Sequence, residues 1–284
     1  MKKITQRCVA NYIPIRDPHM YKGSFKKILC IGGNFQMGGA ILLASAGALQ
    51  AGAGLVTVAS VVENRTPLYI HTPECMFVDI ANKSALKQAL QQNEVILLGP
   101  GLGRNQQARD LYQWVLNQIT TQQLIIDADG LYWLSELQNN FSTCEKMPIL
   151  TPHLGEWERL SHMAPPATDI NKNKCMQQKL NAYVVLKKHR TQLYTPQNIW
   201  ENTAGNPSMA TGGMGDILAG IIAGFVSQFD DVEKALVSAI YIHSYTADVL
   251  AHTHYVTLPT QIISNLPQII AKLTQLKEDI DEKI

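Results

Sequence analysis

The sequence predicts an α/β protein with a mainly parallel central sheet that is covered by helices on both faces. Short apolar runs alternate with helical stretches through most of the 284 residues, as in successive βαβ units. Several of these runs are apolar on both faces, which is typical of central strands in a parallel sheet. No linker or low-complexity break divides the chain, so we expect a single domain over residues 1–284, with a lead-in segment at 1–20 and a charged tail at 278–284.

The expected elements follow one another in a regular order. Strands are predicted at Lys27–Gly32, Leu55–Val62, Glu94–Gly99, Leu124–Asp127, Pro148–Thr151 and Tyr183–Lys187. Helices are predicted between them at Gly39–Ala51, Ser84–Gln91, Gln106–Ile119, Leu131–Gln138, Gly155–His162 and Asn171–Asn181. After residue 190 the alternation ends, and the expected elements are a short hairpin (Gln192–Thr195 and Asn198–Asn202), a glycine-rich segment, and helices near Gly215–Gln228, Val232–His252 and Thr260–Lys277.

The charge of the chain argues against nucleic acid as a partner. The formal net charge is +1, and charged residues make up only 17% of the sequence. A nucleic-acid-binding protein usually needs a basic stripe to neutralise phosphates. We therefore expect no nucleic acid, and any anion that the protein binds must be held by local groups.

The cysteines and the N-terminus favour a cytoplasmic protein. The five cysteines are widely spaced, odd in number and never part of a CxxC motif, which suits a reducing compartment (Cys8, Cys30, Cys75, Cys144 and Cys175). The basic N-terminus lacks the apolar segment of a signal peptide. The uncharged stretch Gly38–Val62 contains five glycines and several polar residues, so its hydrophobicity is low for a membrane span. We expect a protein that does not contact a membrane.

A glycine-rich segment before a long apolar helix carries the strongest functional signal. Gly212, Gly213, Met214 and Gly215 present successive backbone N–H groups at a helix start, which together form an anion cradle. Asp216 follows at once, and a carboxylate there would repel a phosphate unless a substrate hydroxyl lay between them. We therefore predict that Asp216 is a catalytic base that accepts the hydroxyl proton during phosphoryl transfer. The alternative is that Asp216 only caps the helix.

Four other unusual segments stand where predicted strands end. They are Gly32–Ala40, Gly99–Gly103, Thr151–Glu156 and Lys187–Thr191. Ligands of open parallel sheets bind at the carboxyl ends of the strands, so these segments are expected to meet around a ligand. Each has an ordinary alternative as well, since Gly-Gly pairs form turns, Thr-Pro with a following acid starts helices, and strand-end lysines are often merely solvated.

Two common nucleotide motifs are missing from the sequence. There is no GxxxxGK[ST] motif, which excludes a P-loop enzyme, and no strict GxGxxG. The pairs Gly32-Gly33 and Gly38-Gly39, followed by Glu63 after the next predicted strand, match a dinucleotide-binding fold only loosely. That fold is kept as a weaker alternative.

The motifs taken together resemble a known family. GGxGD at a late helix and TPHxGE after a strand look like the ribokinase-like superfamily, and within it the chain is similar to the ADP/ATP-dependent NAD(P)H-hydrate dehydratases. The similarity extends nearly from end to end, in the family order: IPIRDPHMYKGSFKKILCIGGN, AGAGLVTV, GPGLG, DADGL, TPHLGEWERL and NPSMATGGMGDILAG. The resemblance implies a ribokinase-like three-layer αβα sandwich.

The resemblance also implies an activity and a set of site residues. The family phosphorylates the ring hydroxyl of hydrated NADH or NADPH with ADP or ATP and then eliminates phosphate, which with ADP leaves AMP and phosphate. By position, hydrated NAD(P)H is expected at Ala40, Gly103, His153 and Asp216. The adenine nucleotide is expected at Lys187, Lys188, His189, Arg190, Thr191 and Gly215. Glu156 matches the superfamily acid that reaches Mg²⁺ through water.

Three positions depart from the family pattern and bear on nucleotide affinity and preference. Met214 stands where the family usually has threonine, Lys188 replaces a common glycine, and His254-Tyr255-Val256-Thr257 occupies the place of an Arg-Gly segment. Two alternatives remain open, namely a related kinase of a vitamin alcohol and a nucleotide-binding protein without turnover.

The resemblance further predicts the assembly and a partner enzyme. A homotetramer is expected, and the long apolar C-terminal helices are compatible with it. Many relatives carry an epimerase domain ahead of the dehydratase, whereas here the similarity begins near residues 12–23. We therefore expect action on the S epimer alone, with a separate epimerase acting on the same metabolite.

Overall fold

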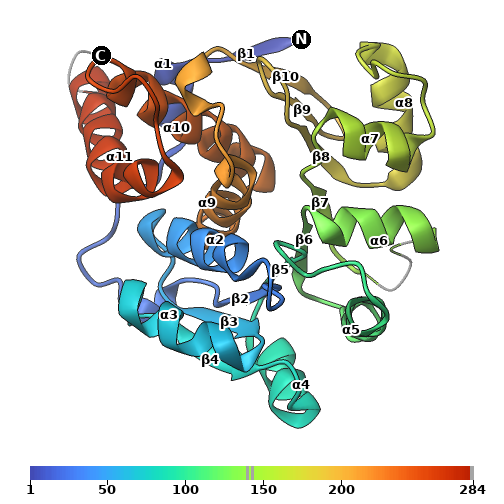
Figure 1. Cartoon of the computed structure of the whole chain (residues 1–284). Coiled ribbons are helices and arrows are strands. Elements are labelled where there is room, and N and C mark those ends of the chain that lie inside the picture. Colours follow the sequence, from blue (N-terminus) through green and yellow to red (C-terminus); the bar gives the residue numbers. More distant parts are fainter. Residues whose placement is uncertain (139–140, 142–143, 282–284) are drawn as a thin grey trace.

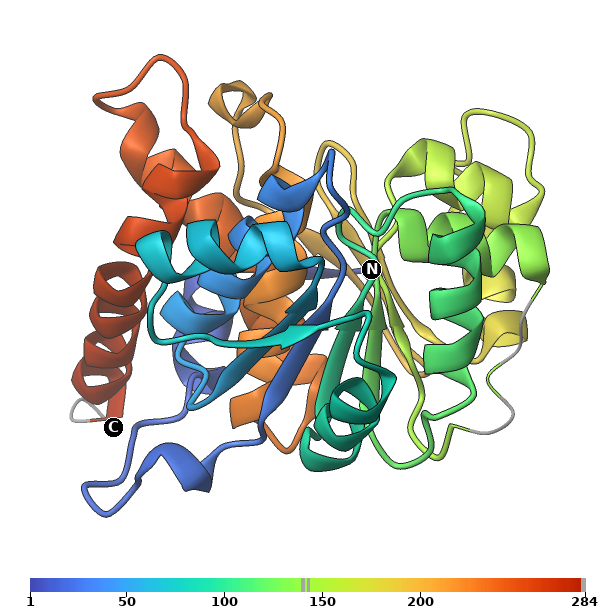
Figure 2. The ribbon, with the colours of Figure 1, turned by 60° about the horizontal axis from the view of Figure 1, so that its bottom comes forward.

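A single mixed sheet passes through the molecule and separates two layers of helices (Figures 1 and 2). The structure is a computed structural model and describes residues 1–138, 141 and 144–281. Within these residues the sheet has ten strands in the order β1-β10-β9-β8-β7-β6-β5-β2-β3-β4. The strands are β1 (Lys2–Ile4), β2 (Ile28–Ile31), β3 (Val56–Ser60), β4 (Met76–Asp79), β5 (Val95–Leu98), β6 (Gln123–Ile126), β7 (Ile149–Leu150), β8 (Tyr183–Leu186), β9 (Gln192–Tyr194) and β10 (Ile199–Asn202).

The central part of the sheet is parallel. Strand β2 pairs in parallel with β3 and β5, and the parallel order continues through β6 and β7 to β8. Strand β9 is antiparallel to both β8 and β10, so residues 192–202 form the predicted hairpin. The carboxyl ends of β5 to β8 consequently lie side by side at one edge of the sheet, which is where a ligand site is expected.

The helices cover both faces of the sheet. They are α1 (Gln6–Tyr12), α2 (Gly38–Gln50), α3 (Arg65–His71), α4 (Lys83–Gln92), α5 (Gln106–Leu116), α6 (Asp129–Leu137), α7 (Leu154–Ser161), α8 (Ile170–Leu180), α9 (Met214–Gln228), α10 (Val232–Ala251) and α11 (Pro259–Asp281), with short 3-10 turns η1 (Lys22–Ser24), η2 (Val62–Asn64) and η3 (Pro207–Met209). Helices α1–α3 and α9–α11 pack on one face, and α4–α8 pack on the other.

Alternation of side chains along the strands divides the core in two. In β2, Ile28 and Cys30 belong to the core on the α2 and α9 side, while Leu29 and Ile31 belong to the core on the α5 and α6 side. Successive strand residues point to opposite faces, so a strand that is buried on both faces must be apolar at every position. The three-layer αβα arrangement predicted from these runs is confirmed.

Helices α2 and α9 approach each other unusually closely beneath the site. A Cβ atom added at Gly220 would lie 1.9 Å from the carbonyl oxygen of Ala44, so only glycine allows this contact. The contact joins the middle of α9 to the middle of α2. Within the described ranges, every helix is too short or too polar to cross a membrane.

The predicted elements agree with the structure except in the first eighty residues of the chain, which supply both edge strands of the sheet. The sequence did not predict β4, a short edge strand whose Met76 is exposed, nor α3, which contains Pro67. It also treated residues 1–20 as a lead-in, whereas β1 joins the sheet beside β10 and Ile4 is fully buried. Short strands at the sheet edge lack the continuous apolar pattern that marks central strands. Of the predicted tail at 278–284, residues 278–281 belong to α11, and residues 282–284 lie outside the described residues.

Candidate active site

The candidate site lies where the carboxyl ends of β5 to β8 meet the N-terminal end of α9. His153 and Lys187 stand at the ends of neighbouring strands and form a parallel β-bridge, in which the Lys187 N–H donates to the Pro152 carbonyl at 2.8 Å. From the other side, Gly215 approaches Lys187, since a Cβ atom added at that glycine would lie 3.2 Å from the lysine Nζ. The fold thus brings together segments that are more than sixty residues apart in the sequence.

The start of α9 is open to a ligand. Gly213 precedes the helix with φ of 91°, a conformation that L side chains rarely adopt. No side chain of the described residues caps this helix, so its first N–H groups remain available to an anion. The alternative that Asp216 serves as the helix cap is therefore not supported. That Gly212, Gly213, Met214 and Gly215 form an anion cradle stays a prediction.

Asp216 carries a carboxylate whose proton affinity is raised. Burial is the main cause, the charges of Asp127 and Asp129 add to it, and Lys187 opposes it, so that the pKa rises from its usual 3.8 to about 6. A carboxylate with a pKa near 6 is mostly ionised at neutral pH, yet it accepts a proton more readily than an ordinary aspartate. These properties suit a general base.

Lys187 and Asp127 form an ion pair at the floor of the site. The Lys187 Nζ lies 2.6 Å from Asp127 Oδ1, and the same oxygen accepts a hydrogen bond from Thr151 Oγ1 at 2.7 Å. Burial lowers the pKa of Lys187, but Asp127 and Glu156 more than offset it, and the net pKa is raised. The lysine is therefore a permanent cation beside the open end of α9. Two positive groups placed together in this way favour a bound phosphate between them.

Glu156 and His153 are linked at the start of α7. The Glu156 carboxylate accepts from the His153 N–H at 2.8 Å, and the His153 ring accepts from the Glu156 N–H at 3.2 Å, which is a capping box. The His153 side chain is 60% exposed, and its Nε2 lies 3.4 Å from Glu156 Oε1. Burial raises the pKa of Glu156 to about 7, although Lys187 opposes the rise.

The residues present fit a magnesium ion that arrives with a nucleotide. In the described part of the chain, no three His, Cys, Asp or Glu side chains are arranged to hold a metal by themselves. Mg²⁺ usually binds through one or two carboxylates, several waters and substrate phosphates. Glu156 supplies such a carboxylate, and a nearby cation would favour its ionised form.

Ala40 and Gly103 belong to two loops that pack on each other. The Gly33 N–H donates to the Pro100 carbonyl at 2.9 Å, and a Cβ atom added at Gly101 would lie 3.1 Å from the Ala40 Cβ. The Gly103 N–H donates to Asp129 Oδ2 at 2.9 Å. Because Asp129 also affects the pKa of Asp216, these loops border the same site.

The weaker dinucleotide alternative finds no support in the Gly32–Ala40 loop. The buried Asn64 side chain lies against it, and its Nδ2 donates to the Gly33 carbonyl at 2.7 Å. A Cβ atom added at Gly38 would lie 2.1 Å from Asn64 Oδ1. Gly33 and Gly38 therefore allow close packing of the Asn64 side chain.

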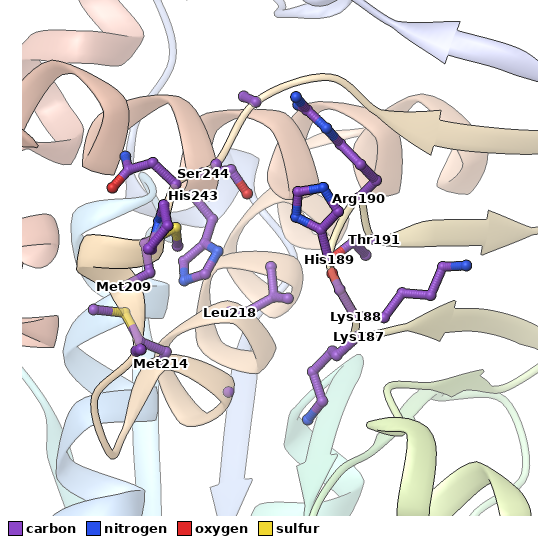
Figure 3. A pocket seen from close by; sticks show the side chains of 16 residues that line it. Lys187, Lys188, His189, Arg190, Thr191, Met209, Met214, Leu218, His243 and Ser244 are labelled. Carbon is purple, nitrogen blue, oxygen red and sulfur yellow. Dashed lines mark hydrogen bonds between the residues drawn. The ribbon is translucent and has the colours of Figure 1, made fainter. Parts of the chain in front are cut away.

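All residues predicted to bind the nucleotide line one cavity of about 350 Å³. They are Lys187, Lys188, His189, Arg190, Thr191 and Gly215. Their side chains differ in direction, because Lys188 points away from the cavity while Lys187 lies at its lower end (Figure 3). Arg190 donates to the Thr203 carbonyl, so its guanidinium is held by the loop. Met214, the departure from the family threonine, lies on the wall opposite Lys187.

The sequence did not single out four residues that contribute to the site. Asp127 and Asp129 lie in the DADGL motif, but the motif does not indicate their contacts. Asp127 pairs with Lys187, and Asp129 accepts from the Gly103 N–H. His243 and Ser244 lie in the apolar part of α10 and line the same cavity as Lys187–Thr191. A histidine in an apolar helix usually indicates only core packing, so the sequence offered no usable signal for it.

The comparisons with known proteins agree with this geometry. A family model described as NAD(P)H-hydrate dehydratase matches residues 28–268. An ADP-dependent (S)-NAD(P)H-hydrate dehydratase of Listeria monocytogenes is 40% identical over 282 residues, covering 98% of this chain and 99% of the relative. The crystal structure of a ribokinase-like superfamily protein from Enterococcus faecalis matches with a TM-score of 0.93, 40% identity and 96% coverage of each chain.

A further solved structure is that of a relative co-crystallised with a nucleotide. The ADP/ATP-dependent NAD(P)H-hydrate dehydratase of Bacillus subtilis, co-crystallised with ATP and Mg²⁺, matches with a TM-score of 0.83 and 26% identity, covering 96% of this chain and 98% of the other. The motifs, the three-layer fold and the arrangement of the site all lead to the same assignment. The chain belongs to the NAD(P)H-hydrate dehydratase family and has the ribokinase-like fold.

Proposed function

We propose that this protein is an ADP-dependent (S)-NAD(P)H-hydrate dehydratase, which restores NADH and NADPH from their hydrated forms. The observation that carries the proposal is the Asp216 carboxylate, which has a pKa of about 6 and lies in the first turn of α9, where the helix start is uncapped and the charge of Lys187 acts on it. A base beside an anion cradle suits phosphorylation of a hydroxyl group. The 40% identity to an ADP-dependent relative over nearly the whole chain supports the choice of substrate and of ADP.

The first step is transfer of a phosphoryl group. ADP occupies the cavity along Lys187–Thr191, with its terminal phosphate at the N-terminal end of α9. Asp216 accepts the proton of the ring hydroxyl while that oxygen forms a bond to phosphorus, and the bond between phosphorus and the bridging oxygen of ADP breaks to release AMP. Lys187 and the free N–H groups of α9 stabilise the charge that develops on the phosphoryl oxygens.

The second step is elimination. The bond between the ring carbon and the phosphate oxygen breaks, and its electron pair leaves with the phosphate. The neighbouring ring carbon then loses a proton, which restores the double bond of the reduced nicotinamide. Ala40, Gly103 and His153 border the space in which the ring is held. Mg²⁺, held by Glu156 through water, would supply positive charge to the phosphates.

One assay distinguishes the proposal from its two alternatives. The protein is incubated with hydrated NADH, Mg²⁺ and ADP, and the absorbance band of reduced nicotinamide is followed. Recovery of the band supports the dehydratase. A stable phosphate ester without recovery would indicate the vitamin-alcohol type of kinase, and nucleotide binding without product would indicate a protein that lacks turnover.

We propose further that the protein is a cytoplasmic homotetramer that works beside a separate epimerase. The long apolar helices at the C-terminal end of the chain support subunit contacts, and the free thiols of the buried Cys30 and Cys75 suit a reducing compartment. Sedimentation at micromolar concentration tests the assembly. A mass near 31.5 kDa, that of one chain, would contradict it.

A further inference from the structure

Arg104 directly follows Gly103 and has guanidinium nitrogens that the fold does not use. Its Nε donates to Asp129 Oδ1 at 2.8 Å, while the other oxygen of that carboxylate accepts from the Gly103 N–H at 2.9 Å. Among the described residues, none accepts a hydrogen bond from the two terminal nitrogens of Arg104. The side chain is 52% exposed, so its remaining N–H groups are accessible to a ligand.

Packing holds the guanidinium group of Arg104 in one place. Its Cζ lies 4.5 Å from the centre of the Tyr132 ring on α6, which is a cation–π contact. A second cation, Arg159 of the neighbouring helix α7, lies 5.6 Å from the centre of the same ring (Figure 1). Within the described ranges, Asp129 is the only carboxylate that forms an ion pair with either arginine. The two arginines therefore keep a net positive charge at this position.

The DADGL motif connects Arg104 with the phosphoryl-transfer groups. Its first carboxylate, Asp127, pairs with Lys187 at 2.6 Å, and its second, Asp129, pairs with Arg104. Ala128 lies between them with φ of 50°, a conformation that L side chains rarely adopt. Such backbone strain persists only where the surrounding structure imposes it, and it is common at functional sites. One strained turn thus holds two cations through two carboxylates.

Arg104 lies on the cofactor side of the site. It does not line the cavity of the Lys187–Thr191 turn. Its neighbour Gly103 belongs to the loop that packs on the Ala40 loop, and both loops border the space in which the hydrated ring is proposed to lie. Burial is the main cause of the raised pKa of Asp216, and the charge of Asp129 adds to it, so Asp129 lies within electrostatic range of the proposed base.

The chemistry of a guanidinium group determines which part of the cofactor suits it. Its N–H groups only donate, and two of them can bind two oxygens of one phosphate in parallel. Hydrated NADH carries a central diphosphate, and hydrated NADPH carries a 2′-phosphate as well. These groups are the only anions of the two molecules, so they gain most from a fixed positive charge.

We propose that the terminal nitrogens of Arg104 bind a phosphate group of hydrated NADH or hydrated NADPH. Arg159 adds positive charge on the other side of the Tyr132 contact. The assignment rests on the proposed repair of hydrated cofactor and adds a binding residue to it. Lys187 would thus serve the phosphates of ADP, while Arg104 would serve those of the second substrate.

Two substitutions separate phosphate binding from support of Asp129. Arg104→Gln places an amide nitrogen at the chain position of Nε, so it keeps a donor for Asp129 and removes the terminal nitrogens. Arg104→Met removes both. Arg109→Met is the matched control, since Arg109 is an exposed arginine on α5. The measurement is kcat and the KM for hydrated NADH, hydrated NADPH and ADP, with Tm as the test of folding.

We expect Arg104→Gln to raise the KM for hydrated cofactor roughly 10–100-fold, the size of a lost charge-assisted contact. Its Tm, its kcat and its KM for ADP should change little, and Arg109→Met should resemble the parent. A rise for both hydrated cofactors identifies the diphosphate, and a rise for hydrated NADPH alone identifies the 2′-phosphate.

Two results would overturn the assignment. If Arg104→Gln resembles the parent while Arg104→Met is impaired, Arg104 serves only to hold Asp129. If the KM for ADP rises as much as the KM for hydrated cofactor, Arg104 does not distinguish the two substrates. Should neither variant fold, calorimetry of the parent protein with NADH and NADPH decides, because these products carry the same phosphates. Affinities that do not fall with rising salt would then reject a phosphate contact.

The same measurements separate this inference from the proposed function. If the parent protein binds NADH or NADPH but does not restore their hydrated forms, the proposed function fails and calorimetry of Arg104→Gln decides on Arg104. If it restores them and Arg104→Gln has the parental KM values, the assignment alone fails. If it neither binds nor restores them, both are overturned.

Discussion

The Nζ of Lys187 lies 2.6 Å from Asp127 Oδ1, which joins the ends of two strands that are not adjacent in the sheet. Strand β7 separates them, and Thr151, which directly follows that strand, donates to the same carboxylate oxygen at 2.7 Å. The lysine is therefore held in one position close to Gly215 at the start of α9. The pair also affects Asp216, because Asp127 raises the pKa of Asp216 and Lys187 lowers it.

Asp216→Asn is expected to remove most turnover while keeping ADP binding. The amide cannot accept the hydroxyl proton, and loss of one such group commonly lowers kcat on the order of 10²–10³-fold. Steady-state rates with hydrated NADH and calorimetric ADP affinity provide the measurement. Turnover within about threefold of the parent would show that Asp216 is not the base.

The same substitution is expected to change the pH dependence of stability. The folded-state pKa of Asp216 is about 6, above its usual 3.8, so the folded protein binds this proton more tightly than the unfolded chain does. The resulting stabilisation is present below pH 3.8 and is lost as the pH rises through 6. Asn carries no charge, so the difference in Tm between Asp216→Asn and the parent should be more positive at pH 8 than at pH 4. A difference independent of pH would contradict the raised pKa.

Asp127→Asn is expected to shift the pH profile of the reaction. The negative charge of Asp127 raises the pKa of Asp216, so its removal should lower that pKa and move the acid limb of kcat/KM to lower pH. Thr151→Val is the matched control, because it removes a hydrogen bond to the same carboxylate but leaves its charge. Equal shifts in the two variants would mean that the charge is not the cause.

Lys187→Met is expected to raise the ADP requirement more than the requirement for hydrated cofactor. A lost charge-assisted contact to phosphate costs roughly 10–100-fold in affinity. Lys188→Met is the control, because that side chain points away from the cavity and only its backbone lies along the nucleotide site (Figure 3). The measurement is the KM for ADP and the KM for hydrated cofactor. The Tm shows whether loss of the ion pair with Asp127 destabilises the variant. Similar KM changes in the two variants would mean that the Lys187–Thr191 turn does not bind ADP through Lys187.

The protein is expected to act on one epimer of hydrated NADH. Asp216 stands at a fixed place at the start of α9, so only one configuration presents its hydroxyl both to this carboxylate and to the phosphoryl group. A mixture of epimers should give a fast phase followed by a slow phase that does not depend on enzyme concentration. Addition of a separate epimerase should abolish the slow phase. Rapid consumption of both epimers without it would refute the stereochemical argument.

Much of the architecture could be predicted from the sequence. Strands such as β2 and β5 are buried on both faces, so every residue in them is apolar. Such a continuous apolar run can be recognised in the sequence without a structure. Glycines before α9 and the adjacent Asp216 also form a local pattern with a direct physical meaning. Edge strands escaped prediction because a strand such as β4, which has one neighbour and an exposed Met76, needs no such run.

The remaining features depend on contacts between distant segments. The sequence alone determined the class of fold, through its apolar runs, and it predicted the anion cradle and the base from residues that are adjacent along the chain. Only the tertiary structure decided that Asp127 binds Lys187, that Lys188 points away from the cavity, and that the buried His243 lines it. Burial and nearby charge set the pKa of Asp216, and both arise only when the strand ends and the start of α9 are brought together.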